Sequence, residues 1–165
     1  MGGTGGGGRR RRPELSPAQR AMGLLVRREH SRKELARKLE AKGVAGEEAE
    51  ATVARMAEAG WQDDGRFATG LARSRAVTGY GPLHIRAELS SHGLDGETIQ
   101  AAFDALAESG EDDWRASARS MVERRYGAGV ADDLALRRKA ADFLFRRGFD
   151  GETVRAATSF DFDEA

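Results

Sequence analysis

The chain of 165 residues contains no cysteine and only three prolines. Without cysteine it has no disulfide, no thiolate nucleophile and no cysteine-ligated metal site. No apolar run approaches the roughly 20 residues that a membrane-spanning helix needs, and the N-terminus has no apolar segment typical of a signal peptide. Hydrophobic residues make up 39% of the chain and charged residues 33%. We therefore expect a helical, cytoplasmic protein with a modest core and no membrane association.

The chain also lacks net charge. Lysine plus arginine and aspartate plus glutamate number 27 each, so attraction to a polyanion must come from local patches. Residues 1–15 combine glycines with four consecutive arginines and offer few side chains for burial, so we expect a disordered leader. The glycines are not followed by the Lys and Ser/Thr of a phosphate-binding loop.

A seven-residue phrase occurs three times, as KGVAGEE, HGLDGET and RGFDGET, with its first glycine at Gly43, Gly93 and Gly148. We interpret it as a helix end followed by a helix start, with this glycine in the left-handed conformation just past the helix. Asp95 and Asp150, two residues further on, are predicted to cap the next helix.

The spacing of these glycines, 50 and then 55 residues, indicates tandem repeats. Apolar residues recur every three or four positions, which predicts helices and no strand. The predicted helices are 17–29, 32–42, 46–59, 64–78, 82–92, 96–109, one from about Trp114, one at about 136–147, and a short one from Gly151. The predicted fold is all-α, an elongated, curved array of three tandem three-helix, helix-turn-helix-like repeats at 16–61, 62–110 and 111–158, followed by an acidic tail at 159–165.

Catalytic and metal-binding patterns are missing from the sequence. The three histidines include no pair at the spacing that places two ligands on one helix face. The paired aspartates at 63–64, 112–113 and 132–133 stand at predicted helix starts, where capping explains them. There is no G-x-S-x-G nucleophile motif. We expect no enzymatic activity, no metal and no cofactor.

Basic side chains that capping does not explain recur in every repeat, mostly on the first two helices, while acidic side chains gather on the third. This distribution predicts a basic stripe suited to a polyanion or an acidic protein surface. Tyr80, between Gly79 and Gly81, either packs between helices or is held out for a partner. The candidate partner- and DNA-binding residues are Arg27, Arg28, Arg32, Lys33, Arg66, Arg73, Arg75, Tyr80, Arg86, Arg124, Arg125, Arg137, Arg138 and Lys139.

The segment DDGRFATGLARSRAVTGYGPLHIRAELSSHGLD, residues 63–95, closely resembles the central segment of the RecX family, the bacterial regulators of the RecA recombinase. Further similarity lies in SRKELARKLEAKG, RRYG and RRKAADFLFRRGF, and the resemblance covers about residues 18–158. It implies a non-catalytic protein that docks along the groove of the RecA filament on single-stranded DNA. There it would block filament growth, favour disassembly, and lower strand exchange, ATP hydrolysis and RecA-stimulated cleavage of the SOS repressor.

Two alternatives remain open. The helix-turn-helix-like units resemble direct DNA-binding modules, which would bind single- or double-stranded DNA independently of RecA and with a steep salt dependence. The second alternative is a structural adaptor for another protein, which would neither bind DNA nor affect RecA. We expect it to be a monomer.

Overall fold

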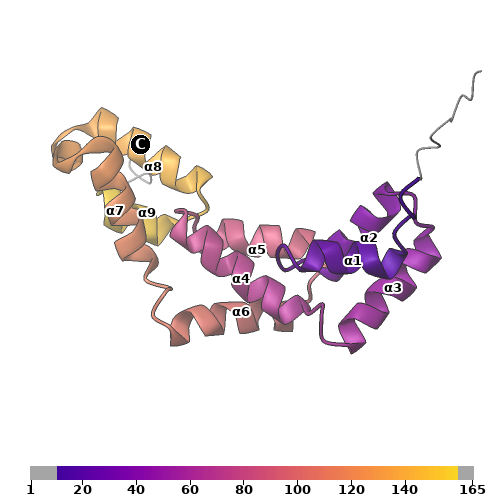
Figure 1. Cartoon of the computed structure of the whole chain (residues 1–165). Coiled ribbons are helices and arrows are strands. Elements are labelled where there is room, and N and C mark those ends of the chain that lie inside the picture. Colours follow the sequence, from indigo (N-terminus) through magenta and orange to yellow (C-terminus); the bar gives the residue numbers. More distant parts are fainter. Residues whose placement is uncertain (1–10, 160–165) are drawn as a thin grey trace, which may run out of the picture.

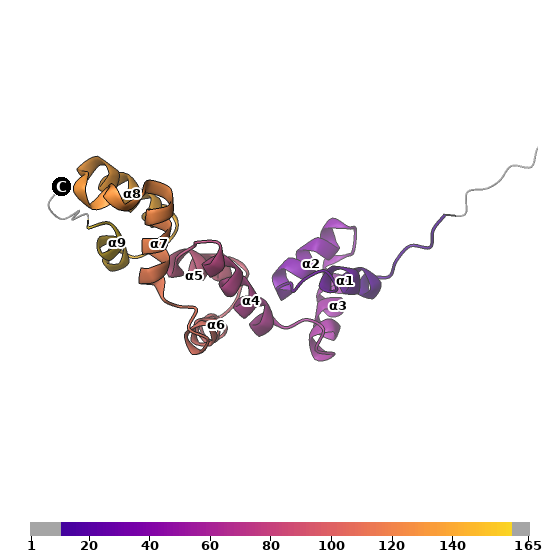
Figure 2. The same ribbon diagram turned by 60° about the vertical axis from the view of Figure 1, so that its left-hand side comes forward.

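The computed structural model describes residues 11–159, in which nine α-helices and one 3-10 helix occur and no strand is present. The helices form three units in a row, and the row is elongated and bent (Figures 1 and 2). This confirms the predicted all-α array. The first unit contains α1 (Pro17–Leu25), α2 (Arg32–Ala41) and α3 (Gly46–Glu58); the second contains α4 (Asp64–Val77), α5 (Pro82–Ser91) and α6 (Gly96–Glu108); the third contains α7 (Trp114–Tyr126), η1 (Ala128–Asp132), α8 (Leu134–Arg146) and α9 (Gly151–Thr158).

Two predictions concern the ends of the chain. The disordered leader at 1–15 and the acidic tail at 159–165 lie mostly outside the described residues, so both stay predictions. The short last helix is present as α9, which has 8 residues where α3 and α6 have 13.

The predicted helix boundaries agree with the structure to within two residues except at the end of α1. That helix was predicted to continue to Glu29 and ends at Leu25, because the chain turns there and brings Arg28 against Glu34 of α2. No pattern in the sequence predicted η1 (Ala128–Asp132). This 3-10 helix occupies the connection between α7 and α8, residues 127–133, which is longer than the connection between α4 and α5, residues 78–81.

Glycine ends most of the helices. The first glycine of each copy of the repeated seven-residue phrase has a positive φ: 90° at Gly43, 72° at Gly93 and 90° at Gly148. This confirms the left-handed conformation predicted for these glycines. Behind Gly148, the backbone N–H of Phe149 donates to the carbonyl of Leu144 at 3.1 Å and closes the end of α8. All the positive-φ glycines of the described chain lie one or two residues past the end of an α-helix: Gly43, Gly60, Gly79, Gly93, Gly110, Gly127 and Gly148.

Aspartates begin most of the helices after α3. In each case one carboxylate oxygen accepts a hydrogen bond from a backbone N–H of the first turn, as capping predicts. Ala45 leaves α3 without such a bond. The capping residues are Asp63, Asp95, Asp113, Asp133 and Asp150. The acidic pairs are thus accounted for by helix starts.

Each unit has its own hydrophobic core. Leu39, Leu89 and Leu144 are fully buried, one in each core. Trp114, at the start of α7, is partly buried and packs against the cores of both the second and the third unit. The units are therefore small bundles that touch along the row instead of sharing one interior.

Candidate interaction surface

The first and second units meet where α2 begins and α5 ends, and we call this contact the first joint. Ser31, the N-cap of α2, places its hydroxyl 2.8 Å from Nδ1 of His92. Lys33 donates from Nζ to the carbonyl oxygen of Ser91 at 3.1 Å. His30 is buried behind this contact, 2% exposed. Lys33, predicted as a partner-binding residue, therefore binds within the chain.

The second joint connects the second and third units in the same way. The backbone N–H of Gly81 donates to the carbonyl of Arg147 at 2.8 Å, and that of Leu83 donates to the carbonyl of Gly148 at 3.0 Å. The guanidinium of Arg147 lies 4.7 Å from the centre of the Tyr80 ring. The start of the second helix of one unit thus contacts the end of the second helix of the next.

The repeated seven-residue phrase has a second role in the structure. It forms the boundary between two helices, as predicted, and in the second and third units its residues also contact the preceding unit. Of the two alternatives for Tyr80, the structure shows the packed one. Its ring is half-buried and stacks on His84 at a centroid distance of 4.3 Å.

The predicted arginines of the second unit all contact other side chains. Arg73 bonds a carboxylate beyond α6, and Arg86 lies 4.1 Å from the centre of an aromatic ring. The contacts are Arg66 with Glu29, Arg73 with Glu111, Arg75 with Glu88, and Arg86 with Phe103. These four arginines are part of the folded structure, so reversing their charge would also change stability.

Apart from Lys33, the predicted cations of the end units divide into two groups. Some make internal contacts: Arg28 with Glu34, Arg124 with the carbonyl of Ser120, Arg125 with the ring of Phe143, and Arg137 with the carbonyl of Ser159. The others are exposed, and their side chains make no hydrogen bond, ion pair or ring contact within residues 11–159. They are Arg27, Arg32, Arg138 and Lys139. The cations that are free to meet a partner therefore lie in the first and third units.

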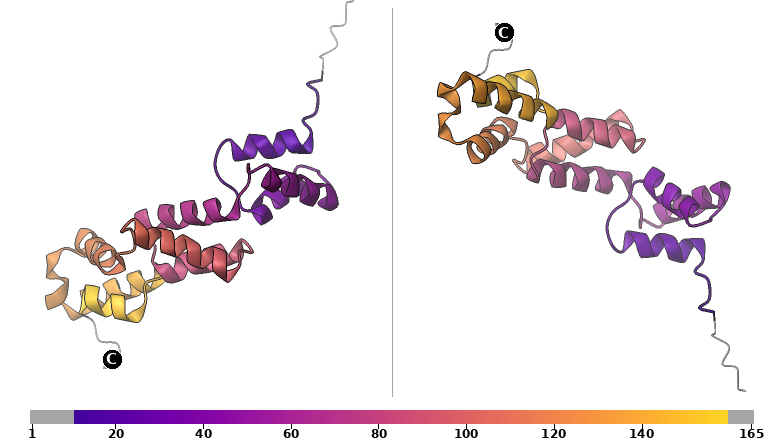
Figure 3. Two further views of the ribbon diagram at one scale, coloured as in Figure 1. Left: turned by 90° about the horizontal axis from the view of Figure 1, so that it is seen from below. Right: turned by 90° about the horizontal axis from the view of Figure 1, so that it is seen from above.

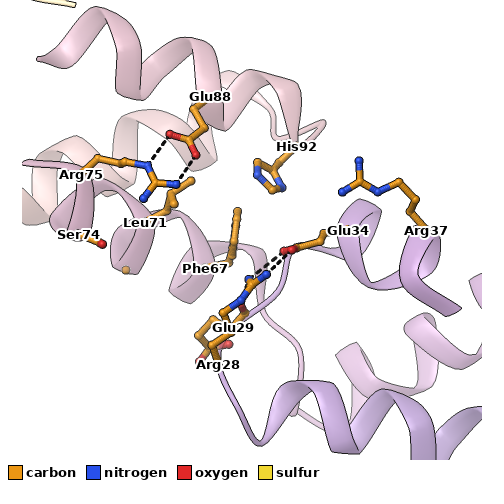
Figure 4. A pocket seen from close by; sticks show the side chains of 11 residues that line it. Arg28, Glu29, Glu34, Arg37, Phe67, Leu71, Ser74, Arg75, Glu88 and His92 are labelled. Carbon is orange, nitrogen blue, oxygen red and sulfur yellow. Dashed lines mark hydrogen bonds and ion pairs between the residues drawn. The ribbon is translucent and has the colours of Figure 1, made fainter. Parts of the chain in front are cut away.

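A cleft of about 660 Å³ lies between the first and second units, beside the first joint (Figure 4). Helix α4 lines the cleft with Leu71, Gly70 and Phe67. Helix α2 contributes Arg37, whose side chain points into the cleft. Two ion pairs lie on its borders. The lining includes Phe67, Gly70, Leu71, Arg37, Glu29, and the pairs Arg28–Glu34 and Arg75–Glu88.

The ion pairs at the cleft shift the ionisation of their members. Burial favours the neutral form of Glu34, but the hydrogen bond and charge of Arg28, with smaller contributions from His30 and Lys38, outweigh it and lower the pKa of Glu34 to about 2. The hydrogen bond from Arg75 lowers the pKa of Glu88. Burial lowers the pKa of His30 and so favours the neutral imidazole.

Residues 11–159 contain no group of three His, Asp or Glu side chains arranged to hold a metal ion. None of the helices there is long and apolar enough to cross a membrane.

Three family models match the chain in succession. They are described as the first, second and third three-helix domains of RecX, and they match residues 19–56, 63–102 and 111–158. The chain belongs to the RecX family. This confirms the resemblance carried by residues 63–95, and the matches follow the three units in the row (Figure 3).

The RecX relatives match over nearly their whole length. The chain is 61% identical over 158 residues to the regulatory protein RecX of Stenotrophomonas maltophilia, covering 95% of this chain and 94% of the relative. It is 57% identical over 155 residues to that of Xanthomonas axonopodis pv. citri, covering 94% and 93%. The crystal structure of RecX from Lactobacillus salivarius superposes with a TM-score of 0.70 at 17% identity, covering 87% of this chain and 92% of that one, and so supports the fold.

Proposed function

We propose that this RecX-family protein binds RecA and the RecA filament on single-stranded DNA, blocks filament extension, promotes disassembly, and so inhibits the recombinase, ATPase and SOS co-protease activities. It acts as a cytoplasmic monomer through its outer surface and not by catalysis. The observation that carries the proposal is membership of the family across all three units, together with 61% identity to a relative named a regulatory protein.

The shape of the chain suits such a role. A row of small units presents a long surface, and a partner built from repeating protomers presents its contacts at regular intervals. Several weak contacts along one body bind tightly together, because each contact raises the effective concentration of the next. The free cations at Arg32, Arg138 and Lys139 lie in the two end units, where they would meet different protomers or the DNA phosphates between them.

The direct test is the ATPase activity of RecA on single-stranded DNA in the presence of this protein below stoichiometric amounts. Blocking filament growth lets one molecule affect many RecA protomers, so we expect a large fall in activity. Unchanged RecA ATPase with the folded protein at equimolar concentration would refute the proposal.

The residue assignment needs variants that keep the fold. Replacing Arg75 alone with glutamate would place two carboxylates together and destabilise α4 against α5. The paired exchange Arg75→Glu with Glu88→Arg keeps an ion pair but moves its positive end. If Arg75 contacts the partner, this double variant should unfold at nearly the same urea concentration and inhibit RecA less.

Arg138 and Lys139 can be reversed directly, because their side chains make no internal contact within residues 11–159. A variant with both changed to glutamate should lose inhibition without losing stability. Direct DNA binding is tested by titrating labelled single- and double-stranded DNA with no RecA present at increasing salt. Strong, salt-sensitive binding that by itself accounts for the inhibition would favour the DNA-binding alternative.

A further inference from the structure

Gly70 stands at the middle of α4, where glycine is less favourable than any residue except proline. The internal structure of the chain gives no reason for it. Its φ is not positive, and a Cβ placed on it would meet no described atom within 4 Å beyond its chain neighbours and the backbone of its own helix. Alanine would therefore fit the free protein and strengthen the helix. Because Gly70 lines the cleft, a Cβ there would project toward whatever occupies it.

Arg37 is the cation of the cleft without a counter-charge. The other two arginines there, Arg28 and Arg75, are held by Glu34 and Glu88. Arg37 makes no ion pair within residues 11–159, and its guanidinium points from α2 into the cleft (Figure 4). Glu29, the remaining carboxylate of the lining, pairs with Arg66, so the cleft has one uncompensated positive charge, which favours a carboxylate on the occupant.

The wall beside Gly70 is apolar. Leu71 is partly buried and packs at the edge of the second core, and the ring of Phe67 lies against His92 at a centroid distance of 4.6 Å. A volume of about 660 Å³ is within the range of sites that hold a few side chains of a ligand. The cleft thus combines a bare stretch of helix backbone, an apolar wall and a cation.

We propose that this cleft binds a short segment of RecA in which a carboxylate side chain neighbours an apolar one. The carboxylate bonds Arg37, the apolar side chain packs on Leu71, and the main chain of the segment crosses α4 at Gly70, where a Cβ would obstruct it. This inference rests on the proposed function, because it takes RecA as the partner.

Gly70→Ala tests the proposal, and Gly23→Ala is its matched control. Gly23 lies in α1, away from the cleft, and a Cβ there also meets no described atom within 4 Å. Both variants should melt roughly 2–4 °C higher, because alanine favours the helix. Only Gly70→Ala should weaken binding to RecA filaments on single-stranded DNA, by about tenfold, as measured by anisotropy of the labelled protein. Arg37→Gln should weaken binding by about tenfold or more through the lost charge-assisted bond.

The results distinguish a wrong assignment of the cleft from a wrong proposed function. If the wild-type protein does not bind RecA, the proposed function and this inference fail together. If the wild type and Gly23→Ala bind and Gly70→Ala binds equally well, only the cleft assignment is wrong. If sedimentation shows that the wild type self-associates and Gly70→Ala does not, a second copy occupies the cleft, and the proposal is overturned.

Discussion

Replacing Gly81 with alanine should separate the second unit from the third while leaving both folded. The backbone of Gly81, with φ of −88° and ψ of 170°, is a conformation that any residue adopts, so alanine causes no local strain. Its Cβ, however, would lie 2.4 Å from the carbonyl oxygen of Gly148 and 2.6 Å from the nitrogen of Phe149. These are backbone atoms, which cannot rotate away as a flexible side chain can.

The chain can relieve this clash by opening the second joint. The loss in free energy of unfolding is therefore at most the stabilisation that the contacts of this joint provide. Opening loses the hydrogen bonds from Gly81 to Arg147 and from Leu83 to Gly148, each with a net value of about 1 kcal/mol. It also loses the contact of Arg147 with Tyr80, worth about 0.5–1 kcal/mol. We therefore expect the free energy of unfolding to fall by about 3 kcal/mol.

Urea denaturation measures this loss, and small-angle X-ray scattering measures the accompanying change in shape, since an opened joint changes the distance between the end units. Gly96→Ala is the control: Gly96 begins α6 in the same unit, and a Cβ there meets no described atom within 4 Å. Stability within about 0.5 kcal/mol of wild type, together with an unchanged scattering profile, would show that the joint does not depend on close approach at Gly81.

Other predictions concern single side chains. The pKa of Glu34 is lowered from 4.5 to about 2 in the fold, so its ionisation stabilises the protein above about pH 4.5 and that contribution, up to about 3 kcal/mol, is lost as the pH falls towards 2. Glu34→Gln should therefore flatten the dependence of the urea midpoint on pH below 4.5, and an unchanged slope would contradict the assignment. Ala45→Asp should supply the missing cap of α3 and add about 1 kcal/mol, visible as a higher melting temperature; no rise would count against the capping argument. Trp114→Ala should lower the free energy of unfolding by about 3 kcal/mol and destabilise the second and third units together, because its ring packs on both cores. Hydrogen exchange of backbone amides measures this, and faster exchange in only one of the two units would contradict the prediction.

The helices and their ends could be predicted from the sequence because they depend on neighbours. A glycine that ends a helix, or an aspartate that begins one, acts within a single helical turn. The roles of Gly93 and Asp95 therefore do not depend on the tertiary structure around them. The end of α1 was predicted wrongly because it depends on a contact outside the helix. The chain leaves that helix at Leu25 to bring Arg28 against Glu34, a contact made across a turn and not within a helix.

The candidate site was decided by the tertiary structure. Arg73 and Glu111 are 38 residues apart, and nothing local indicates that they pair. In the sequence Gly81 is part of a turn; in the structure it is a point of contact with Gly148 of the next unit. Gly70 and Arg37 belong to different units and face one cleft only because the first joint sets the units at one angle. Periodicity in the sequence specifies each bundle, but the relative placement of the bundles depends on contacts between residues far apart in the chain, and that placement decides which charges remain free for a partner.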